Sequence, residues 1–186
     1  MKRNVLVIHG AGEPRRRNGK VYWEPLLQHG LGKTYVVRAP RMPHPEHPQY
    51  KPWADRIVEL LADSADPILV GHSFGASVLL KHLAEAAKRP AVAGVFLVAT
   101  PFWGANFAEF ALPSDFGVRL RDLTPLYFYQ SRDDSEVPIE HLERFRRALP
   151  QAVVRVLDGR GHEFDQPDFP ELVADIRNSA VGRQCD

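Results

Sequence analysis

The sequence has little of what a disulfide-rich, membrane-spanning or nucleic-acid-binding protein needs. Its only cysteine, Cys185, lies one residue from the C-terminus, so no internal disulfide can form and a catalytic thiol is not expected there. The N-terminal apolar run covers only Val5 to Ile8, and no stretch approaches the roughly 20 apolar residues that cross a bilayer. The 24 basic and 23 acidic side chains give a formal net charge of +1, which provides no overall field for nucleic acid or an anionic membrane. We therefore expect a cytoplasmic protein that binds neither.

The remaining composition is that of one globular domain. Hydrophobic residues make up 44% of the 186 residues and charged residues 25%, close to the averages for soluble proteins. Two separate cores would each be small at this length. We expect a single domain over residues 1–186.

Short β-rich runs alternate with helical patterns along the chain. Most of the runs are continuously apolar, which is typical of parallel strands covered by helices on both faces. The six runs are Val5–Ile8, Tyr35–Arg38, Ile68–Val70, Val95–Ala99, Leu126–Tyr129 and Val153–Leu157. Apolar residues at helical spacing predict helices around Trp53–Leu61, Phe74–Lys88, Pro138–Leu149 and Phe169–Ile176. The pattern predicts a doubly wound α/β fold with a mostly parallel six-stranded sheet.

Two stretches do not fit this alternation. Pro40–Pro52 contains five of the 16 prolines, and Pro101–Thr124 has weak periodicity, so we predict that both are loops. Loops after the carboxyl ends of parallel strands line the ligand site of α/β proteins. Both stretches are therefore candidate pocket walls.

The segment with the clearest chemical meaning is ILVGHSFG, residues 68–75. A predicted strand runs through Gly71-His72-Ser73-Phe74-Gly75 directly into a predicted helix, which is the context of a nucleophile elbow. The glycines allow a strained turn that projects the side chain of Ser73 into a cleft. The alternative is a glycine-rich turn in which Ser73 only caps the helix. We favour Ser73 as a nucleophile.

A serine nucleophile needs a base and a group that orients the base. Of the histidines after the elbow, His82 and His141 fall in predicted helices, whereas His162 lies in a glycine-rich loop after the last strand and can reach back to Ser73. The acid is expected in the loop after the fifth strand. We favour Asp134 there, with Asp133 and Glu136 as alternatives that are otherwise solvated charges.

Other residues have candidate roles around this centre. The backbone N–H groups of Ala11, in the loop after the first strand, and of Phe74 are expected to form the oxyanion hole. His9, Phe102, Trp103 and Phe107 are candidate substrate-binding residues, although the three aromatic rings are equally consistent with ordinary packing. Arg15–Arg17 could attract an anionic group, but a solvated charge run is the simpler reading. His44, Glu46 and His47 lack a completing cluster, so we expect no metal site and no cofactor.

These motifs resemble the α/β-hydrolase superfamily, and within it the small serine hydrolases without a lid domain, of the retinoblastoma-binding-protein-9 and YdeN type. The resemblance rests on VLVIHGAG at residues 5–12, the elbow, SRDDSEVP at 131–138 and DGRGHEF at 158–164, and it spans almost the whole chain. It implies a minimal hydrolase fold, with Asp134 as the acid because it lies four residues before Pro138. The implied activity is hydrolysis of a small-molecule acyl ester through an acyl-enzyme on Ser73.

The resemblance fixes the chemistry better than the substrate. An amidase, peptidase or thioesterase would use the same three residues. A non-catalytic protein that binds a partner through its cleft is a further alternative, but such a protein has no need of a nucleophile, acid and base in this order.

Overall fold

The computed structural model describes residues 2–14, 16–17, 19–104 and 107–181. Its centre is a six-stranded sheet in the order β4-β1-β5-β6-β7-β8, in which every neighbouring pair is parallel. The strands are β1 Arg3–Ile8, β4 Tyr35–Arg38, β5 Ile68–His72, β6 Gly94–Val98, β7 Leu126–Ser131 and β8 Val153–Leu157. The predicted doubly wound sheet is confirmed, and all six predicted strands lie in it.

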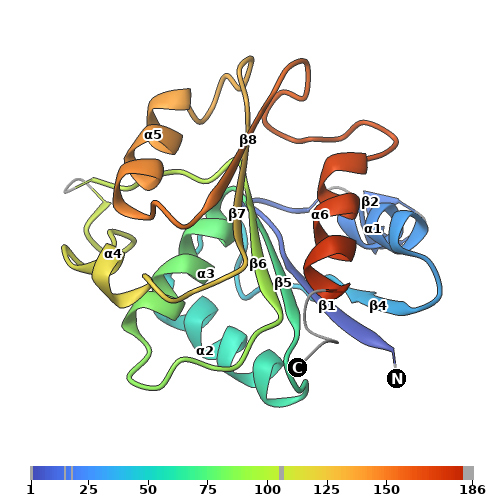
Figure 1. Ribbon diagram of the computed structural model, residues 1–186, viewed down its shortest axis with the longest axis horizontal. Coiled ribbons are helices and arrows are strands. Elements are labelled where there is room, and N and C mark those ends of the chain that lie inside the picture. Colours follow the sequence, from blue (N-terminus) through green and yellow to red (C-terminus); the bar gives the residue numbers. More distant parts are fainter. Residues whose placement is uncertain (1, 15, 18, 105–106, 182–186) are drawn as a thin grey trace.

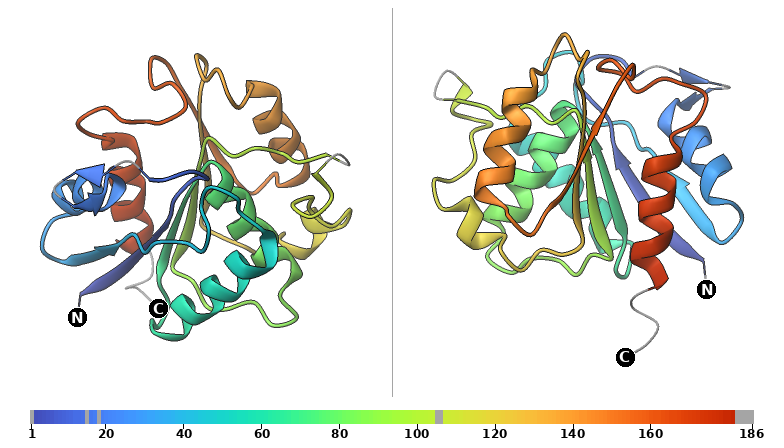
Figure 2. Two further views of the ribbon diagram at one scale, coloured as in Figure 1. Left: turned by 180° about the vertical axis from the view of Figure 1, so that it is seen from behind. Right: turned by 45° about the horizontal axis from the view of Figure 1, so that its top comes forward.

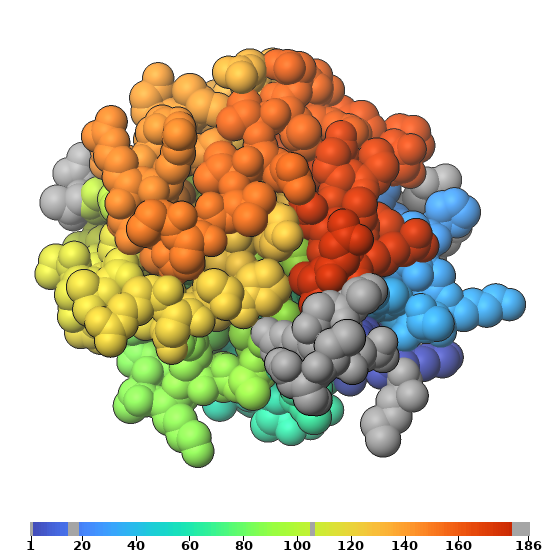
Figure 3. All heavy atoms as spheres, viewed as in Figure 1, coloured from blue at the N-terminus to red at the C-terminus, as the bar shows by residue number. Residues whose placement is uncertain are grey.

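Helices cover both faces of the sheet. They are α1 Trp23–Leu31, α2 Tyr50–Ala62, α3 Phe74–Glu85, α4 Phe116–Arg119, α5 Ile139–Ala148 and α6 Pro170–Val181. Helices α1 and α6 pack on one face, and α2, α3 and α5 on the other (Figures 1 and 2). In the space-filling view, the chain from α5 to α6, coloured orange to red, covers the upper part of the visible face (Figure 3).

The two faces correspond to two apolar cores. In β1 the side chains alternate, with Leu6 and Ile8 in the core beneath α2 and α3, and Val5 and Val7 in the core beneath α1 and α6. All five residues of β5 are buried, as are all five of β6. This explains why these strands have continuous apolar runs in the sequence.

Four local features differ from the sequence expectations. Helix α1 was not expected, and β2 (Arg16–Arg17) and β3 (Lys20–Val21) add a small antiparallel hairpin. The stretch 101–124 contains α4, and α2 already begins at Tyr50. Pro52 therefore lies in the first turn of α2, where a missing N–H costs no helical hydrogen bond.

The strand order places a topological switch between β1 and β5. From β1 the chain first proceeds to β4 on one side and then returns to β5 on the other. The loops after β1 and β5 therefore diverge above the carboxyl edge of the sheet, where doubly wound proteins bind ligands. Within the described parts of the chain, no helix is both long and apolar enough to cross a membrane.

Candidate active site

Ser73 occupies a strained turn between β5 and α3. Its backbone angles, φ 51° and ψ −123°, lie in a region that side chains disfavour, and its N–H donates to the carbonyl of Val98 in β6 at 2.8 Å. A Cβ at Gly71 would lie 2.6 Å from Cα of Ala76, and one at Gly75 would lie 2.3 Å from the carbonyl oxygen of His9. Both glycines of the elbow are therefore required by close backbone contacts.

The structure brings the three predicted residues into one hydrogen-bonded chain. Nε2 of His162 lies 2.9 Å from Oγ of Ser73, and Nδ1 of His162 lies 3.0 and 3.1 Å from the two carboxylate oxygens of Asp134. The side chains of His162 and Asp134 are 6% and 1% exposed. Because a carboxylate only accepts, the proton belongs on Nδ1, which leaves Nε2 to accept the serine proton.

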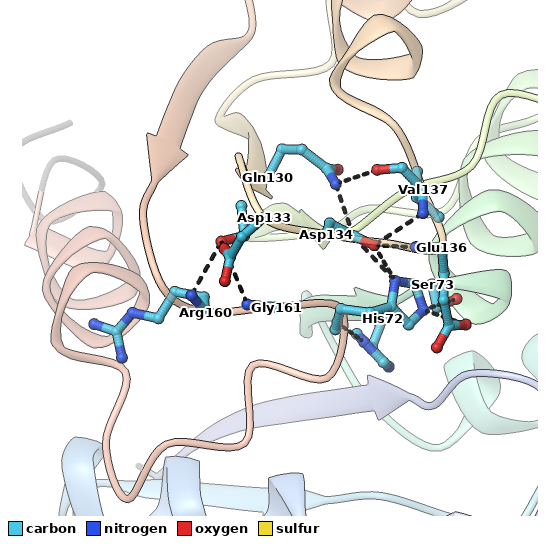
Figure 4. A network of polar contacts seen from close by, with 11 residues as sticks. His72, Ser73, Gln130, Asp133, Asp134, Glu136, Val137, Arg160 and Gly161 are labelled. Carbon is cyan, nitrogen blue, oxygen red and sulfur yellow. Dashed lines mark hydrogen bonds and ion pairs between the residues drawn. The ribbon is translucent and has the colours of Figure 1, made fainter.

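The carboxylate of Asp134 is fixed by three further donors. Its Oδ1 accepts the backbone N–H groups of Glu136 at 2.9 Å and Val137 at 2.8 Å, and its Oδ2 accepts the side-chain amide of Gln130 at 2.8 Å (Figure 4). Gln130 also donates to the carbonyl of Val137 at 2.8 Å, which fixes its amide orientation. The turn after β7 thus holds the carboxylate against His162.

The two alternative acids have other positions. Asp133 contacts the hydroxyl of Ser131 and accepts the N–H of Gly161 at 3.3 Å, and the Ser131 hydroxyl lowers the pKa of this carboxyl. Oγ of Ser131 accepts the N–H of Arg160 at 3.0 Å. Asp133 therefore braces the backbone before His162 (Figure 4). Glu136 is 64% exposed, with its carboxylate 3.6 Å from Nε2 of His162.

The loop after β1 is held by His9, whose side chain is 2% exposed. Nδ1 of His9 lies 2.7 Å from the carbonyl oxygen of Gly10, and the N–H of Met42 donates to Nε2 at 3.3 Å, so His9 carries its proton on Nδ1. In a trans peptide the C=O and N–H groups point in opposite directions. The bond from His9 to Gly10 therefore fixes the direction of the Ala11 N–H.

The two predicted oxyanion donors follow the ends of β1 and β5 in the chain. Among the described residues, neither the N–H of Ala11 nor that of Phe74 has an acceptor. Phe74 is the first residue of α3, where the N–H groups have no partner within the helix and carry its positive dipole end. A Cβ at Gly10 would lie 3.3 Å from Cβ of Ser73, so the Ala11 loop directly adjoins the nucleophile.

His72 contacts the active-site histidine from the elbow itself. Its Nε2 lies 2.9 Å from the carbonyl oxygen of His162, which only accepts, so the proton lies on Nε2. The ring centroid is 5.2 Å from that of Trp23. Burial lowers the pKa of His72 to about 4, so the ring is neutral near pH 7. His72 therefore anchors the backbone of the His162 loop.

A cavity of about 240 Å³ opens beside Ser73. Its walls come from the loop after β1, the start of α1 and the loop around His162. They comprise His9, Gly10, Ala11, Glu13, Pro14, Val21, Tyr22, Trp23, His72, Ser73, Glu136, His162, Glu163 and Asp165. No described residue of Pro40–Pro52 or Pro101–Thr124 lines this cavity, so the expectation that these stretches form its walls is wrong. The first of them lies behind the oxyanion loop, where Pro45 accepts the N–H of Gly12 at 2.7 Å.

Of the four candidate substrate-binding residues, only His9 lines the cavity. Trp103 packs on Phe74 and Phe107, with ring centroids 6.1 and 5.0 Å away. Phe102 packs on Phe145 at 5.1 Å, and its N–H donates to Nδ1 of His141 at 2.8 Å. Phe107 is 54% exposed. These aromatic residues belong to the packing on the α3 side of the elbow.

Sequence reasoning missed His72, Gln130 and Trp23. His72 and Gln130 are polar residues inside strands that are otherwise apolar and buried, and this contrast was a usable signal. Trp23, Leu26, Leu27 and Leu31 form an apolar stripe, although Pro25 and Gly30 interrupt the helical pattern.

The charge run at Arg15–Arg17 lies outside the described residues, except for the backbone of Arg16 and Arg17. The described chain contains no group of three or more His, Cys, Asp and Glu residues arranged to hold a metal.

Comparison with known proteins yields a family and several similar folds. The sequence model of the serine hydrolase family matches residues 5–168. The ydeN gene product of B. subtilis superposes with a TM-score of 0.80 at 19% identity, over 97% of this chain and 100% of that one. Est1E from Butyrivibrio proteoclasticus superposes with a TM-score of 0.73 at 15% identity, over 98% of this chain and 89% of that one. None of the curated proteins compared with the chain matches it significantly in sequence.

Proposed function

The chain belongs to the serine hydrolase family and has the α/β-hydrolase fold, and from this premise we propose that it hydrolyses a small acyl ester through an acyl-enzyme on Ser73. One observation carries the proposal: the unbroken chain from Oγ of Ser73 through His162 to Asp134, which opens on a cavity. A serine that only caps a helix has no need of this arrangement.

In the proposed reaction Oγ of Ser73 attacks the acyl carbonyl carbon while its proton passes to Nε2 of His162. The carbonyl oxygen becomes an oxyanion that the N–H groups of Ala11 and Phe74 stabilise. His162 then gives its proton to the leaving oxygen, and the acyl group stays on Ser73. A water molecule, deprotonated by the same nitrogen, attacks the acyl-enzyme, releases the acid and restores the serine. Asp134 holds the tautomer and stabilises the imidazolium.

The volume of the cavity favours small substrates. At about 240 Å³ it lies below the range of about 300–1,000 Å³ that is usual for sites of drug-sized ligands. Thioesters and amides of similar size fit the same geometry, so these substrates remain the alternatives. The cytoplasmic location expected from the lone cysteine also remains a prediction.

A fluorophosphonate probe tests the proposal directly. We expect the intact protein to take up one equivalent at Ser73, as mapped by peptide mass spectrometry, and Ser73→Ala to take up none. Ser73→Ala and His162→Ala should each lower ester hydrolysis by about 10⁴-fold or more while circular dichroism stays unchanged. Folded protein that takes up no probe would favour the alternative of a non-catalytic binding protein, and labelling at another serine would refute the assignment of Ser73 as the nucleophile.

A further inference from the structure

Carboxylates outnumber basic side chains among the described residues that line the cavity beside Ser73. Four of its lining residues are acidic, and among the described residues none of the lining residues is Lys or Arg: the acidic residues are Glu13, Glu136, Glu163 and Asp165. Glu13 pairs with Arg41, whose guanidinium lies outside the lining. The carboxylate of Glu136 lies 3.6 Å from Nε2 of His162, and Glu163 directly follows His162 in the chain and lines the same cavity.

His72 provides a hydrogen-bond acceptor that also favours a ligand with hydrogen-bond donors. His72 is 5% exposed and lines the cavity, and its Nε2–H is committed to the carbonyl of His162. The remaining nitrogen, Nδ1, carries a lone pair beside Gly10, 3.4 Å from where a Cβ of that residue would lie. Among the described residues, nothing donates a hydrogen bond to this nitrogen. The side chain is nine-tenths buried and lines the cavity, so its open acceptor suits a ligand that donates a hydrogen bond.

The remaining polar group at the start of α1 offers no competing donor. The hydroxyl of Tyr22 lies 2.7 Å from the carbonyl oxygens of Asp165 and of Gln166, which takes up its single proton. The same wall contributes the ring of Trp23, and aromatic rings attract cations. The cavity is therefore built mainly from acceptors, carboxylates and aromatic surface.

We infer that the substrate is a small acyl ester that carries an ammonium group, either on its acyl part or on its leaving group. An ammonium supplies both the positive charge that Glu136 and Glu163 favour and, where it bears hydrogen, the donor that Nδ1 of His72 lacks. The inference rests on the proposed hydrolysis at Ser73, whose substrate class it specifies. An ester that carries a carboxylate represents the opposite charge preference.

Matched esters separate these charge preferences. The pairs are acetylcholine with 3,3-dimethylbutyl acetate, β-alanine methyl ester with methyl butanoate, and monomethyl succinate with methyl pentanoate. Each kcat/KM is divided by the rate constant of the same ester with hydroxide, which removes intrinsic reactivity. In at least one of the first two pairs, we expect the cationic ester to be preferred by about tenfold at low ionic strength, and the preference to shrink in 0.5 M NaCl.

Charge-neutral variants locate the source of the preference. In the double variant Glu136→Gln with Glu163→Gln, the cationic-to-neutral ratio should fall to within about threefold of one. Glu59→Gln, on the exposed face of α2, is the matched control and should keep the wild-type ratio. Equal rates within both cationic pairs, or a preference for monomethyl succinate, would overturn the inference. If Ser73 still takes up the fluorophosphonate in that case, only the substrate class is wrong, whereas absent labelling would remove the proposed function as well.

Discussion

Replacing Asp134 by Asn tests how the active site keeps His162 in its basic form. Oδ1 of Asp134 accepts two backbone N–H groups, at 2.9 and 2.8 Å, so the amide oxygen of Asn must take this position. The NH₂ group then replaces Oδ2, which lies 3.0 Å from Nδ1 of His162. The amide oxygen at the Oδ1 position lies 3.1 Å from Nδ1 but already accepts two backbone N–H groups, whereas the NH₂ group donates to Nδ1, so the ring proton is expected to move to Nε2. His162 would then face Ser73 with a donor and could not act as its base.

We expect Asp134→Asn to lower kcat by about 10⁴, the size of effect that a wrong imidazole tautomer has in serine proteases. The same NH₂ group also faces the amide of Gln130, which lies 2.8 Å from Oδ2 and is held by Val137. Two donors in contact should cost about 1–3 kcal/mol of unfolding free energy. Hydrolysis of a p-nitrophenyl ester, measured under conditions in which the variant is folded, gives the loss in kcat. Urea unfolding gives the loss in stability.

Asp133→Asn is the matched control for Asp134→Asn, because it makes the same Asp-to-Asn change at the adjacent residue. Asparagine keeps an amide oxygen that accepts the Ser131 hydroxyl and the Gly161 N–H, so the brace on the His162 loop survives. We expect a loss of no more than about tenfold. Equal losses in the two variants, or a larger loss in Asp133→Asn, would refute the assignment of Asp134 as the orienting acid.

Two further predictions concern stability. Because Ser73 has a φ of 51°, Ser73→Gly should be about 1 kcal/mol more stable than Ser73→Ala in urea unfolding, and equal stabilities would show that the elbow is unstrained. The pKa of His72 is about 4 in the folded protein and about 6.5 when unfolded, so the unfolded state binds the proton more strongly and stability is lost as the pH falls from 6.5 to 4. Between pH 7 and 4.5 the wild type should lose about 2 kcal/mol more than His72→Asn, and parallel losses would contradict this.

The positions of the strands along the chain and the nucleophile could be predicted because both depend on local pattern. Continuously apolar runs identify β5 and β6, which are buried on both faces, and the glycines of the elbow are fixed by contacts with the neighbouring helix and loop. Asp133 and Asp134 could not be separated by chain geometry, since both lie in one short turn after β7. Their different roles arise from the N–H groups of Glu136 and Val137, which bind only Asp134.

Helix α1 was missed because tertiary contacts override its poor local propensity. Gly30 weakens an isolated helix, but a Cβ there would lie 2.6 Å from Cγ2 of Val173 in α6, so the glycine allows the two helices to pack closely. Because α1 was not predicted, its residues were not expected to line the pocket. The start of α1 supplies Tyr22 and Trp23 to the cavity wall, and no motif in the sequence connects this segment with the elbow.

The loop that carries His162 owes its position to two separate segments. Ser131, at the end of β7, and Asp133, just after it, hold the N–H groups of Arg160 and Gly161, and His72, at the end of β5, holds the carbonyl of His162. Loops of this kind are ordinarily the most mobile part of a fold, and a displacement of about 1 Å at a reacting group can cost about 100-fold in rate. Because these bonds fix the backbone on both sides of His162, its ring can meet Ser73 and Asp134 at once without first losing conformational freedom. The strained elbow and the braced loop therefore serve one purpose, since each places one partner of the 2.9 Å contact between Oγ of Ser73 and Nε2 of His162.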